Sequence, residues 1–271
     1  MLQSLRSAAM PWSVLAIQFC IELAFGVLFA MAFVPKAPVG VLFYRLMGTA
    51  ALVLVFIGIG VPVASGRFEL GDPVLLAGGL AVLGYPFYSG PVRGRRWALA
   101  LGVGLLGTAL AVGMLVGRAM GPDASPLGIL LATLSALATG AVAGSVGLAM
   151  VLGHWYLTVP NLQVRHLRRL NRLTVFTMLA SVALVGISCW VFAELLRAAE
   201  RPLFGATGLF YLGTRVVVGL VFPLGFAWMT AESLKFENTR SATGILYAST
   251  VLVLIGTAVS VSLQDSYGVP L

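Results

Sequence analysis

The stretch LGILLATLSALATGAVAGSVGLAMVLGHWY, residues 127–156, decides the fold class of this chain. It contains no aspartate, glutamate, lysine or arginine. An α-helix of this length is about 45 Å long, whereas the hydrocarbon core of a bilayer is about 30 Å thick. We therefore expect residues 127–156 to form a membrane-spanning helix that is strongly tilted or projects from the bilayer.

The composition extends this interpretation to the whole chain. Hydrophobic residues make up 59% of the 271 residues and charged residues 10%, and the mean hydropathy is +1.01. Soluble domains carry about 25% charged residues, so an all-α, polytopic membrane bundle is expected, with one transmembrane domain over residues 1–271 and no soluble domain. The eight predicted spans are Trp12–Phe33, Val39–Val61, Val74–Ser89, Trp97–Gly117, Leu127–Tyr156, Thr174–Leu196, Thr207–Ala231 and Thr243–Leu263.

The third and the first of these spans differ from the others. Val74–Ser89 is short and contains three glycines and Pro86, so we expect it to be kinked or partly unwound. The apolar stretch from Trp12 is too long for the core of a signal peptide, so we expect it to be retained as the first span.

The basic residues between the spans predict the orientation. One side of the membrane receives five of them, Arg6, Arg67, Arg118, Arg197 and Arg201. The other side receives ten, which are Lys36, Arg93, Arg95, Arg96, Arg165, Arg168, Arg169, Arg172, Lys235 and Arg240. The side with more lysine and arginine is usually cytoplasmic, so both termini are expected on the non-cytoplasmic face of a bacterial cytoplasmic membrane. Because this asymmetry accounts for the net charge of +8, we expect lipid and not nucleic acid as the partner.

The longest connection, LTVPNLQVRHLRRLNRL (157–173), has a character of its own. Its leucines at 162, 167, 170 and 173 recur among arginines. This spacing predicts a short basic amphipathic helix on the anionic cytoplasmic leaflet. The segment either anchors the protein or docks other membrane or cytoplasmic subunits.

Ionisable residues inside apolar runs are the candidate site, because each costs at least a few kcal/mol in hydrocarbon. The predicted topology gathers several polar residues near the cytoplasmic face, His154, Glu232, Arg45 and Tyr85 or Tyr88, with Glu22 deeper in the membrane. An imidazole exchanges protons near neutral pH, a carboxylate orients it or relays the proton, and a phenol hydrogen-bonds a carbonyl oxygen. This set of groups is suited to bind a quinone head group and equally to proton-coupled transport.

Structural roles remain open for the same residues. His154 belongs to GHWYL (153–157), which is also typical of an interfacial aromatic belt. Glu232 lies near Lys235 and can form an interfacial ion pair with it. Arg45 with Glu22, and Glu194 with Arg215 near the outer face, are predicted as structural pairs because an unpaired charge there is expensive.

Motifs for other chemistry are missing from the sequence. His154 and His166 are separated by Pro160, so an intramolecular bis-histidine haem is not expected. Cys20 and Cys189 form no CxxC motif, which argues against a structural zinc site, and no Walker loop, HExxH or GxSxG occurs.

Three functions follow from these observations. The leading one is a membrane subunit of a respiratory or other redox complex, with a quinone near the cytoplasmic face. The alternatives are a small proton-coupled transporter and a scaffold subunit without a site, so enzymatic activity stays open. Small-xxx-small spacing at Gly113–Gly117 and Gly140–Gly144 favours close helix packing, and we expect it between spans four and five. VGVLFYRLMG (39–48) and TGLFYLGTR (207–215) match only in shifted register, so no repeated halves are predicted.

Overall fold

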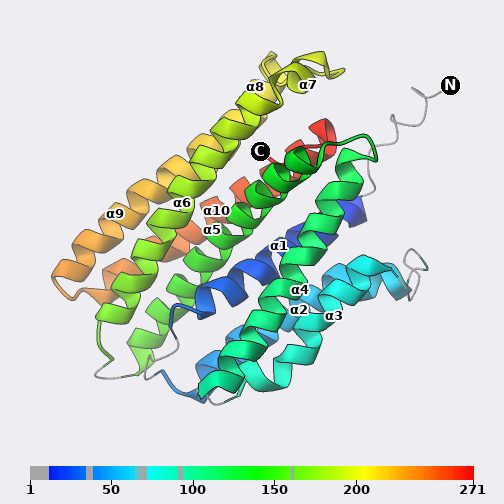
Figure 1. The fold of residues 1–271 in the computed structure, drawn as a ribbon. Helices are drawn as coiled ribbons and strands as arrows, with labels where there is room; N and C mark the ends of the chain where they lie inside the picture. The colour runs from blue at the N-terminus through cyan, green and yellow to red at the C-terminus, as the bar shows by residue number, and fades with distance from the viewer. Residues whose placement is uncertain (1–11, 35–38, 65, 67–71, 91–93, 160–161) are drawn as a thin grey trace.

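The computed structural model describes residues 12–34, 39–64, 66, 72–90, 94–159 and 162–271, which form a bundle of antiparallel helices (Figure 1). Two apolar helices, Leu15–Met31 and Pro73–Tyr88, are shorter than a typical span. Within the described residues, six helical stretches are long and apolar enough to cross a membrane, namely Val41–Gly60, Gly94–Met120, Pro126–Thr158, Arg165–Val191, Ala206–Lys235 and Thr239–Tyr267. The predicted all-α membrane bundle is confirmed, while the count of eight spans and the orientation of the termini stay predictions.

The helices coincide with the predicted spans. They are α1 (Trp12–Met31), α2 (Val41–Ala64), α3 (Pro73–Tyr88), α4 (Gly94–Met120), α5 (Pro126–Thr158), α6 (Arg165–Val191), α7 (Ala193–Ala198), α8 (Ala206–Gly213), the π-helix η1 (Thr214–Val221), α9 (Phe222–Lys235) and α10 (Thr239–Tyr267). α8, η1 and α9 follow one another without a break and together form one long helical stretch.

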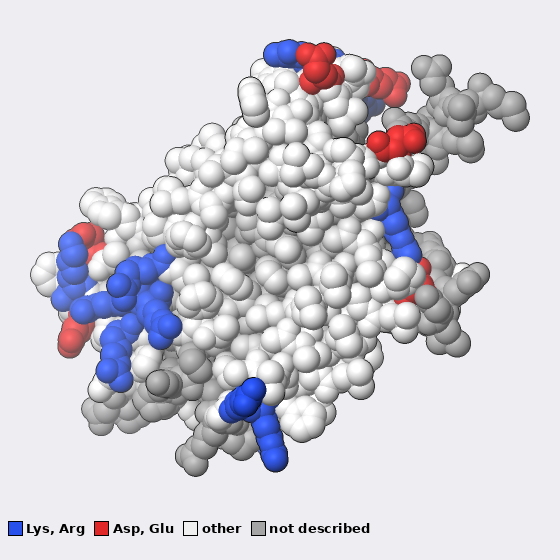
Figure 2. All heavy atoms as spheres, in the orientation of Figure 1, with Lys and Arg blue, Asp and Glu red and all other residues white. Residues whose placement is uncertain are grey.

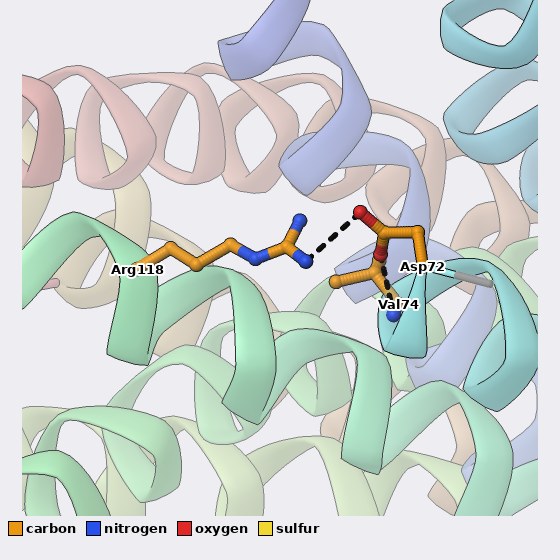
Figure 3. Close-up of polar contacts among 3 residues, drawn as sticks. All are labelled: Asp72, Val74 and Arg118. Atoms are coloured by element: carbon orange, nitrogen blue, oxygen red, sulfur yellow. Dashed lines mark hydrogen bonds and ion pairs between the residues drawn. The ribbon is translucent and has the colours of Figure 1, made fainter. Parts of the chain in front are cut away.

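Local sequence explains where α3 and α5 begin. Asp72 accepts a hydrogen bond from the Val74 amide at 2.7 Å, and Ser125 does the same for the Gly128 amide at 3.1 Å. A proline follows each of these N-caps, at the position where its missing N–H costs nothing. Asp72 also pairs with Arg118 of α4 at 2.9 Å, which ties the start of α3 to the end of α4 (Figure 3).

The expected unwinding of the third span does not occur. α3 is a single helix of 16 residues that continues through Pro86 to Tyr88. Pro86 has no N–H to donate to the Val82 carbonyl and lies two residues before the end of α3, so the disturbed hydrogen bonding is confined to the last turns of the helix.

The helices are arranged in two halves of the same order. In the first half, α1 packs on α2, α2 on α3, α3 on α4, and α4 on α1. In the second half, α5 packs on α6, α6 on α9, α9 on α10, and α10 on α5. The halves meet along α1 and α5, flanked by contacts of α4 with α5 and of α1 with α10. The sequence did not predict this arrangement. The two halves repeat the same order of helix contacts, but their residues show no matching pattern.

Glycines bring α1 and α5 together at the boundary between the halves. A Cβ atom added to Gly26 would lie 1.8 Å from the Gly140 carbonyl oxygen, and one added to Gly144 would lie 1.9 Å from the Gly26 carbonyl carbon. The small-xxx-small pair Gly140–Gly144 therefore packs on α1 and not on α4. Gly113 and Gly117 do face α5, at ordinary van der Waals distances.

Residues 157–173 do not form a separate helix on the membrane surface. α5 continues to Thr158, and Arg165 already begins α6. The leucines at 162, 167, 170 and 173 are buried in the same apolar core as α1 and α2, while the arginines between them are exposed. The apolar side of this stretch therefore packs on other helices of the protein, and its arginines lie on the exposed side. Pro160 and Asn161 lie outside the described residues.

Basic side chains gather at one end of the bundle, visible at the lower left and bottom of Figure 2. We call this the basic end; it holds the connections α5–α6 and α9–α10 (Figure 1). Its described lysines and arginines are Arg45, Arg95, Arg96, Arg165, Arg168, Arg169, Arg172, Lys235 and Arg240. The opposite end holds Arg118, Arg197 and Arg201 among the described residues. Arg6, Lys36, Arg67 and Arg93, which the orientation prediction also used, lie outside the described residues.

Candidate functional site

The residues predicted to cluster near the basic end are distributed over separate contacts. His154 of α5 is exposed and lies beside Tyr247 of α10, with 3.3 Å between its Nδ1 and the phenol oxygen. Tyr85 of α3 contacts the Thr49 hydroxyl of α2 at 2.8 Å. The Tyr88 hydroxyl is buried and donates to the Ala81 carbonyl of its own helix at 2.8 Å.

The two charged members of this group are also placed apart. Arg45 is exposed on α2, whereas Glu22 is buried, and the structure gives no contact between them. Glu232 pairs with Lys235 at 2.6 Å, which is the interfacial ion pair that the sequence suggested. The structure thus joins none of His154, Glu232, Arg45 and the two tyrosines of α3 into one site, apart from an edge-on contact between Tyr85 and Tyr88.

The predicted pair of Glu194 and Arg215 does not form. Glu194 is exposed on the short helix α7, at the opposite end of the bundle from the arginines of α6. Arg215 instead points into the bundle and is completely buried. The sequence sorted these residues by depth alone, whereas the rotation of the helix decides which neighbours a side chain meets.

Arg215 is held by groups from three other parts of the fold. Its Nη2 donates to the Thr139 hydroxyl of α5 at 2.8 Å and to the Ser181 hydroxyl of α6 at 2.9 Å. Its Nε donates to the main-chain oxygen of Leu271 at 3.1 Å. The Ser260 hydroxyl of α10 donates to that same oxygen, so the acceptor is itself fixed.

Glu22 of α1 and Arg215 of η1 are both buried. A Cβ added to Gly140 would lie 2.3 Å from the Glu22 carbonyl oxygen, and Gly140 directly follows Thr139, the partner of Arg215, so both charged residues contact the same turn of α5. Gln18, one helical turn before Glu22, donates from its Nε2 to Glu22 Oε1 at 2.7 Å. The same Nε2 donates to Oε1 of Gln264 on α10. We call Gln18, Glu22, Thr139, Ser181, Arg215 and Gln264 the central network.

Three atoms of the central network have no hydrogen-bond partner. They are Glu22 Oε2, Arg215 Nη1 and Gln264 Nε2, and all are buried. A buried polar group without a partner costs about 1–3 kcal/mol, and more when it is charged. Such groups are therefore expected to meet water, an ion or a ligand in the working protein.

The position of Arg215 depends on the irregular helix η1. Single π-turns within α-helices are rare and frequently accompany functional sites. η1 also packs unusually close to α10, since a Cβ added to Gly219 would lie 2.6 Å from the Gly256 Cα. The wider turn and the close approach together set the helix face from which Arg215 reaches α5 and α6.

The central network lies deep in the bundle. Glu22 follows Trp12, the first residue of α1, by ten residues, and Arg215 follows Ala206 by nine. At 1.5 Å per residue, both side chains are about 14–15 Å from the starts of their helical stretches, half of a hydrocarbon core of about 30 Å.

Sequence reasoning selected Glu22 and Arg215 but missed the residues that surround them. Gln18 had a usable signal, because a polar residue four positions before Glu22 shares its helix face. Gln264 had a weaker signal, because it directly follows the last predicted span, Thr243–Leu263, and precedes the polar residues Asp265 and Ser266. Thr139 and Ser181 had none, since hydroxyl residues are common in membrane helices and mostly bond their own backbone.

The described residues include no group of three or more histidine, cysteine, aspartate or glutamate side chains placed to hold a metal ion. Cys20 and Cys189 are both free thiols. The central network thus offers amide, hydroxyl, carboxylate and guanidinium groups, which suit hydrogen bonding and proton exchange. Comparisons with family models, with curated proteins and with solved structures gave no match for this chain.

Proposed function

We propose that the protein is a small proton-coupled transporter whose solute and proton site is the central network. The observation that carries this proposal is the burial of two ionisable residues, Glu22 in the first half of the bundle and Arg215 in the second. An ionisable side chain within the membrane is costly and usually marks a solute, ion or proton pathway.

The distribution of the network over the two halves supports transport. Gln18 and Glu22 belong to the first half, and Thr139, Ser181, Arg215 and Gln264 belong to the second. Transporters commonly bind their solute near the midplane, at the interface between structural repeats. A relative motion of the halves changes the distance between the carboxylate and the guanidinium, and with it the access to both.

Each group has a defined task in this mechanism. Glu22 takes up and releases the proton at its carboxylate, with Oε2 as the unpartnered oxygen. Arg215 supplies a fixed positive charge that Thr139 and Ser181 hold in place. The Gly26–Gly140–Gly144 contact is the point about which α1 and α5 pivot, because side chains there do not separate the helices.

The bacterial cytoplasmic membrane is the proposed location, with the basic end in the cytoplasm. The excess of exposed arginines at that end supports this orientation. The opposite end, where α1 begins and α10 ends, then faces outward, and the proton motive force is directed from this end through the central network toward the basic end.

The test is proton movement in liposomes that contain the purified protein and a trapped pH-sensitive dye. A panel of neutral, anionic and cationic solutes is added outside. We expect at least one solute to drive acidification or alkalinisation of the lumen, and Glu22→Gln to reduce the proton flux by about tenfold or more. Glu200→Gln, which removes an exposed carboxylate, is the matched control and is expected to leave the flux unchanged.

The proposal fails if folded protein moves no proton with any solute class. It also fails if Glu22→Gln transports protons as the unaltered protein does. Folding of each variant is checked by its elution from a sizing column and its thermal unfolding in detergent.

A second candidate is a quinone-binding membrane subunit of a respiratory or other redox complex, and the contact between His154 and Tyr247 favours it. Both side chains are exposed toward the outside of the bundle, where a lipid-soluble quinone has access. An imidazole and a phenol are suitable donors to a quinone carbonyl. The partner subunits would dock at the basic end through residues 157–173.

Quinone binding is tested by quenching of tryptophan fluorescence with a short-chain quinone in detergent. This candidate predicts weaker quenching for His154→Ala, while Glu22→Gln is unaffected. A scaffold subunit without a site would instead bind no quinone, move no proton and be purified from native membranes together with other subunits.

A further inference from the structure

We propose that the central network binds a small monovalent oxyanion, such as a short monocarboxylate, and does so together with a proton on Glu22. This inference rests on the proposed transport function and names the class of solute. It follows from the atoms of the network that have no partner and from the balance of charge around them.

The first step is the inventory of unused hydrogen-bonding groups. Arg215 Nη1 and Gln264 Nε2 are donors, and neither has an acceptor. Glu22 Oε2 is an acceptor while the carboxylate is ionised, and it becomes a donor once it is protonated. The protonated network therefore offers three unsatisfied donor groups. The lone pairs of an oxyanion can accept hydrogen bonds from these donors, whereas a cation offers no acceptor for them.

The second step is the charge. With Glu22 ionised, its negative charge offsets the positive charge of Arg215, and an incoming anion meets no net attraction. With Glu22 neutral, none of the side chains that bond the buried Arg215 carries a negative charge, because they are the hydroxyls of Thr139 and Ser181, and this is unfavourable for a buried cation. One monovalent anion restores neutrality, so protonation and anion binding favour each other.

The groups that surround Glu22 agree with this coupling. α1 packs on α2, α4, α5 and α10. The described charged residues on these helices lie near their ends, and they are Arg45 on α2, Arg95, Arg96 and Arg118 on α4, and Arg240 and Asp265 on α10, with His154 on α5. Arg215 is the buried charged residue that contacts the same turn of α5 as Glu22, through Thr139, which directly precedes Gly140. Neutralising Glu22 thus leaves Arg215 as the charge that the solute must balance.

The third step is the chemistry of the guanidinium group. Arginine presents parallel N–H donors that match two oxygens of one carboxylate. Thr139 and Ser181 hold Nη2 from one side, which leaves Nη1 for a ligand oxygen. Gln18, Glu22, Gln264 and Arg215 are each at most 4% exposed, so a ligand bound to them would be enclosed by protein.

The transport step is balanced without a redox or covalent change. One proton binds to the Glu22 carboxylate and one monovalent anion binds to Arg215 and Gln264, so the loaded site carries the same net charge as the empty one. Both leave on the other side. Transport is therefore electroneutral and depends on the pH difference and not on the membrane potential.

The experiment measures uptake of radiolabelled pyruvate and lactate into liposomes, with glycerol and a quaternary ammonium ion as the neutral and cationic probes. We expect an acidic exterior to raise the uptake of at least one monocarboxylate by about tenfold. We also expect that clamping the membrane potential with potassium and valinomycin leaves this uptake unchanged.

Two variants separate the roles of the proton and the anion. Glu22→Gln mimics the protonated carboxylate, so it is expected to bind the monocarboxylate and to exchange it for unlabelled anion at all pH values, without response to a pH difference. Arg215→Lys keeps the charge and loses Nη1, and it is expected to weaken anion binding while the protein remains folded. Binding to both variants is measured in detergent as ligand-induced thermal stabilisation.

The outcomes distinguish this inference from the function on which it rests. If glycerol or the ammonium ion moves protons and no monocarboxylate does, the anion inference is wrong and the transport proposal stands. If Glu22→Gln loses anion binding while still folded, the proposed linkage is wrong. If no probe and no proton moves, the transport proposal itself is wrong.

Discussion

At the scale of single residues, the fate of Arg215 illustrates how a membrane protein retains a buried charge. Three acceptors occupy its Nε and Nη2 groups. Each hydrogen bond to a buried charged group is worth about 1.5–3 kcal/mol, so the hydroxyls of Thr139 and Ser181 have a structural task as well as a functional one.

We predict that Thr139→Val lowers the stability by about 1.5–3 kcal/mol, because valine keeps the shape and removes the acceptor. Thr230→Val is the matched control, since the Thr230 hydroxyl is buried and has no hydrogen-bond partner. Thermal unfolding in detergent is the measurement. Equal stability of the two variants would contradict the role assigned to Thr139.

A similar pair is available on α6. Ser181→Ala is expected to destabilise the protein by about 1.5–3 kcal/mol, whereas Ser188→Ala removes a buried hydroxyl that makes no hydrogen bond and is expected to be nearly neutral. The measurement is the unfolding midpoint of both variants in parallel. A larger loss for Ser188→Ala would show that packing, and not the bond to Arg215, governs this helix.

The sequence indicated which ionisable residues matter but paired them incorrectly. The sequence pairs Glu22 with Arg45, and Arg215 with Glu194, because each pair lies on neighbouring spans and an unpaired charge in the membrane is expensive. In the fold, Arg45 and Glu194 are exposed, whereas Glu22 and Arg215 are buried. Hydropathy reports position along the membrane normal and contains little information about rotation of a helix around its axis.

At the scale of the elements, glycine contacts fix the distance between α1 and α5. We predict that Gly144→Ala destabilises the protein by about 1–3 kcal/mol, because the added Cβ would overlap the α1 backbone at Gly26. Gly147→Ala in the same helix is the control, since nothing lies within 4 Å of its added Cβ. The comparison is made by thermal unfolding, and similar midpoints would mean that the two helices separate at little cost.

The elements themselves were largely predictable from hydropathy, because long apolar runs have few alternatives in a bilayer. The sequence predicts a surface helix for the first turns of α6. A row of leucines on one side of a helix gives the same sequence pattern whether lipid or protein covers that side. The π-turn at Thr214–Val221 carries no sequence signature, although it sets the direction of Arg215. The pairing of Gly140–Gly144 with Gly26 of α1 required knowledge of which helices are neighbours.

At the scale of the whole molecule, the orientation in the membrane can be tested directly. In a Cys20→Ala, Cys189→Ala background, cysteines are introduced separately at Gln163 and Asp123, which are exposed at opposite ends of the bundle. We expect a membrane-impermeant thiol reagent to label Asp123→Cys in intact cells and Gln163→Cys only after lysis. The reverse pattern would contradict the predicted cytoplasmic position of the basic end.

The proposed motion between the halves has its own test. A Cβ on Gly113 of α4 would lie 3.4 Å from the Thr133 methyl of α5, so Gly113→Cys with Thr133→Cys is close enough to form a disulfide across the boundary. Oxidation is expected to stop proton flux in liposomes, and reduction is expected to restore it. Full flux in the oxidised double variant would mean that the halves do not move at this contact. Each single cysteine variant serves as the control.

The unequal lengths of α3 and α5 affect the lipid around the protein. α3 has 16 residues and α5 has 33, which correspond to about 24 Å and 50 Å of helix. On the side of α3, the surrounding acyl chains must shorten or disorder to match its apolar length, while α5 meets the mismatch by tilting or by extending into the head-group region. The protein is therefore expected to favour bilayers of short or unsaturated lipids. In a thicker bilayer, the mismatch between the lipid and the apolar length of the protein would be largest beside α3.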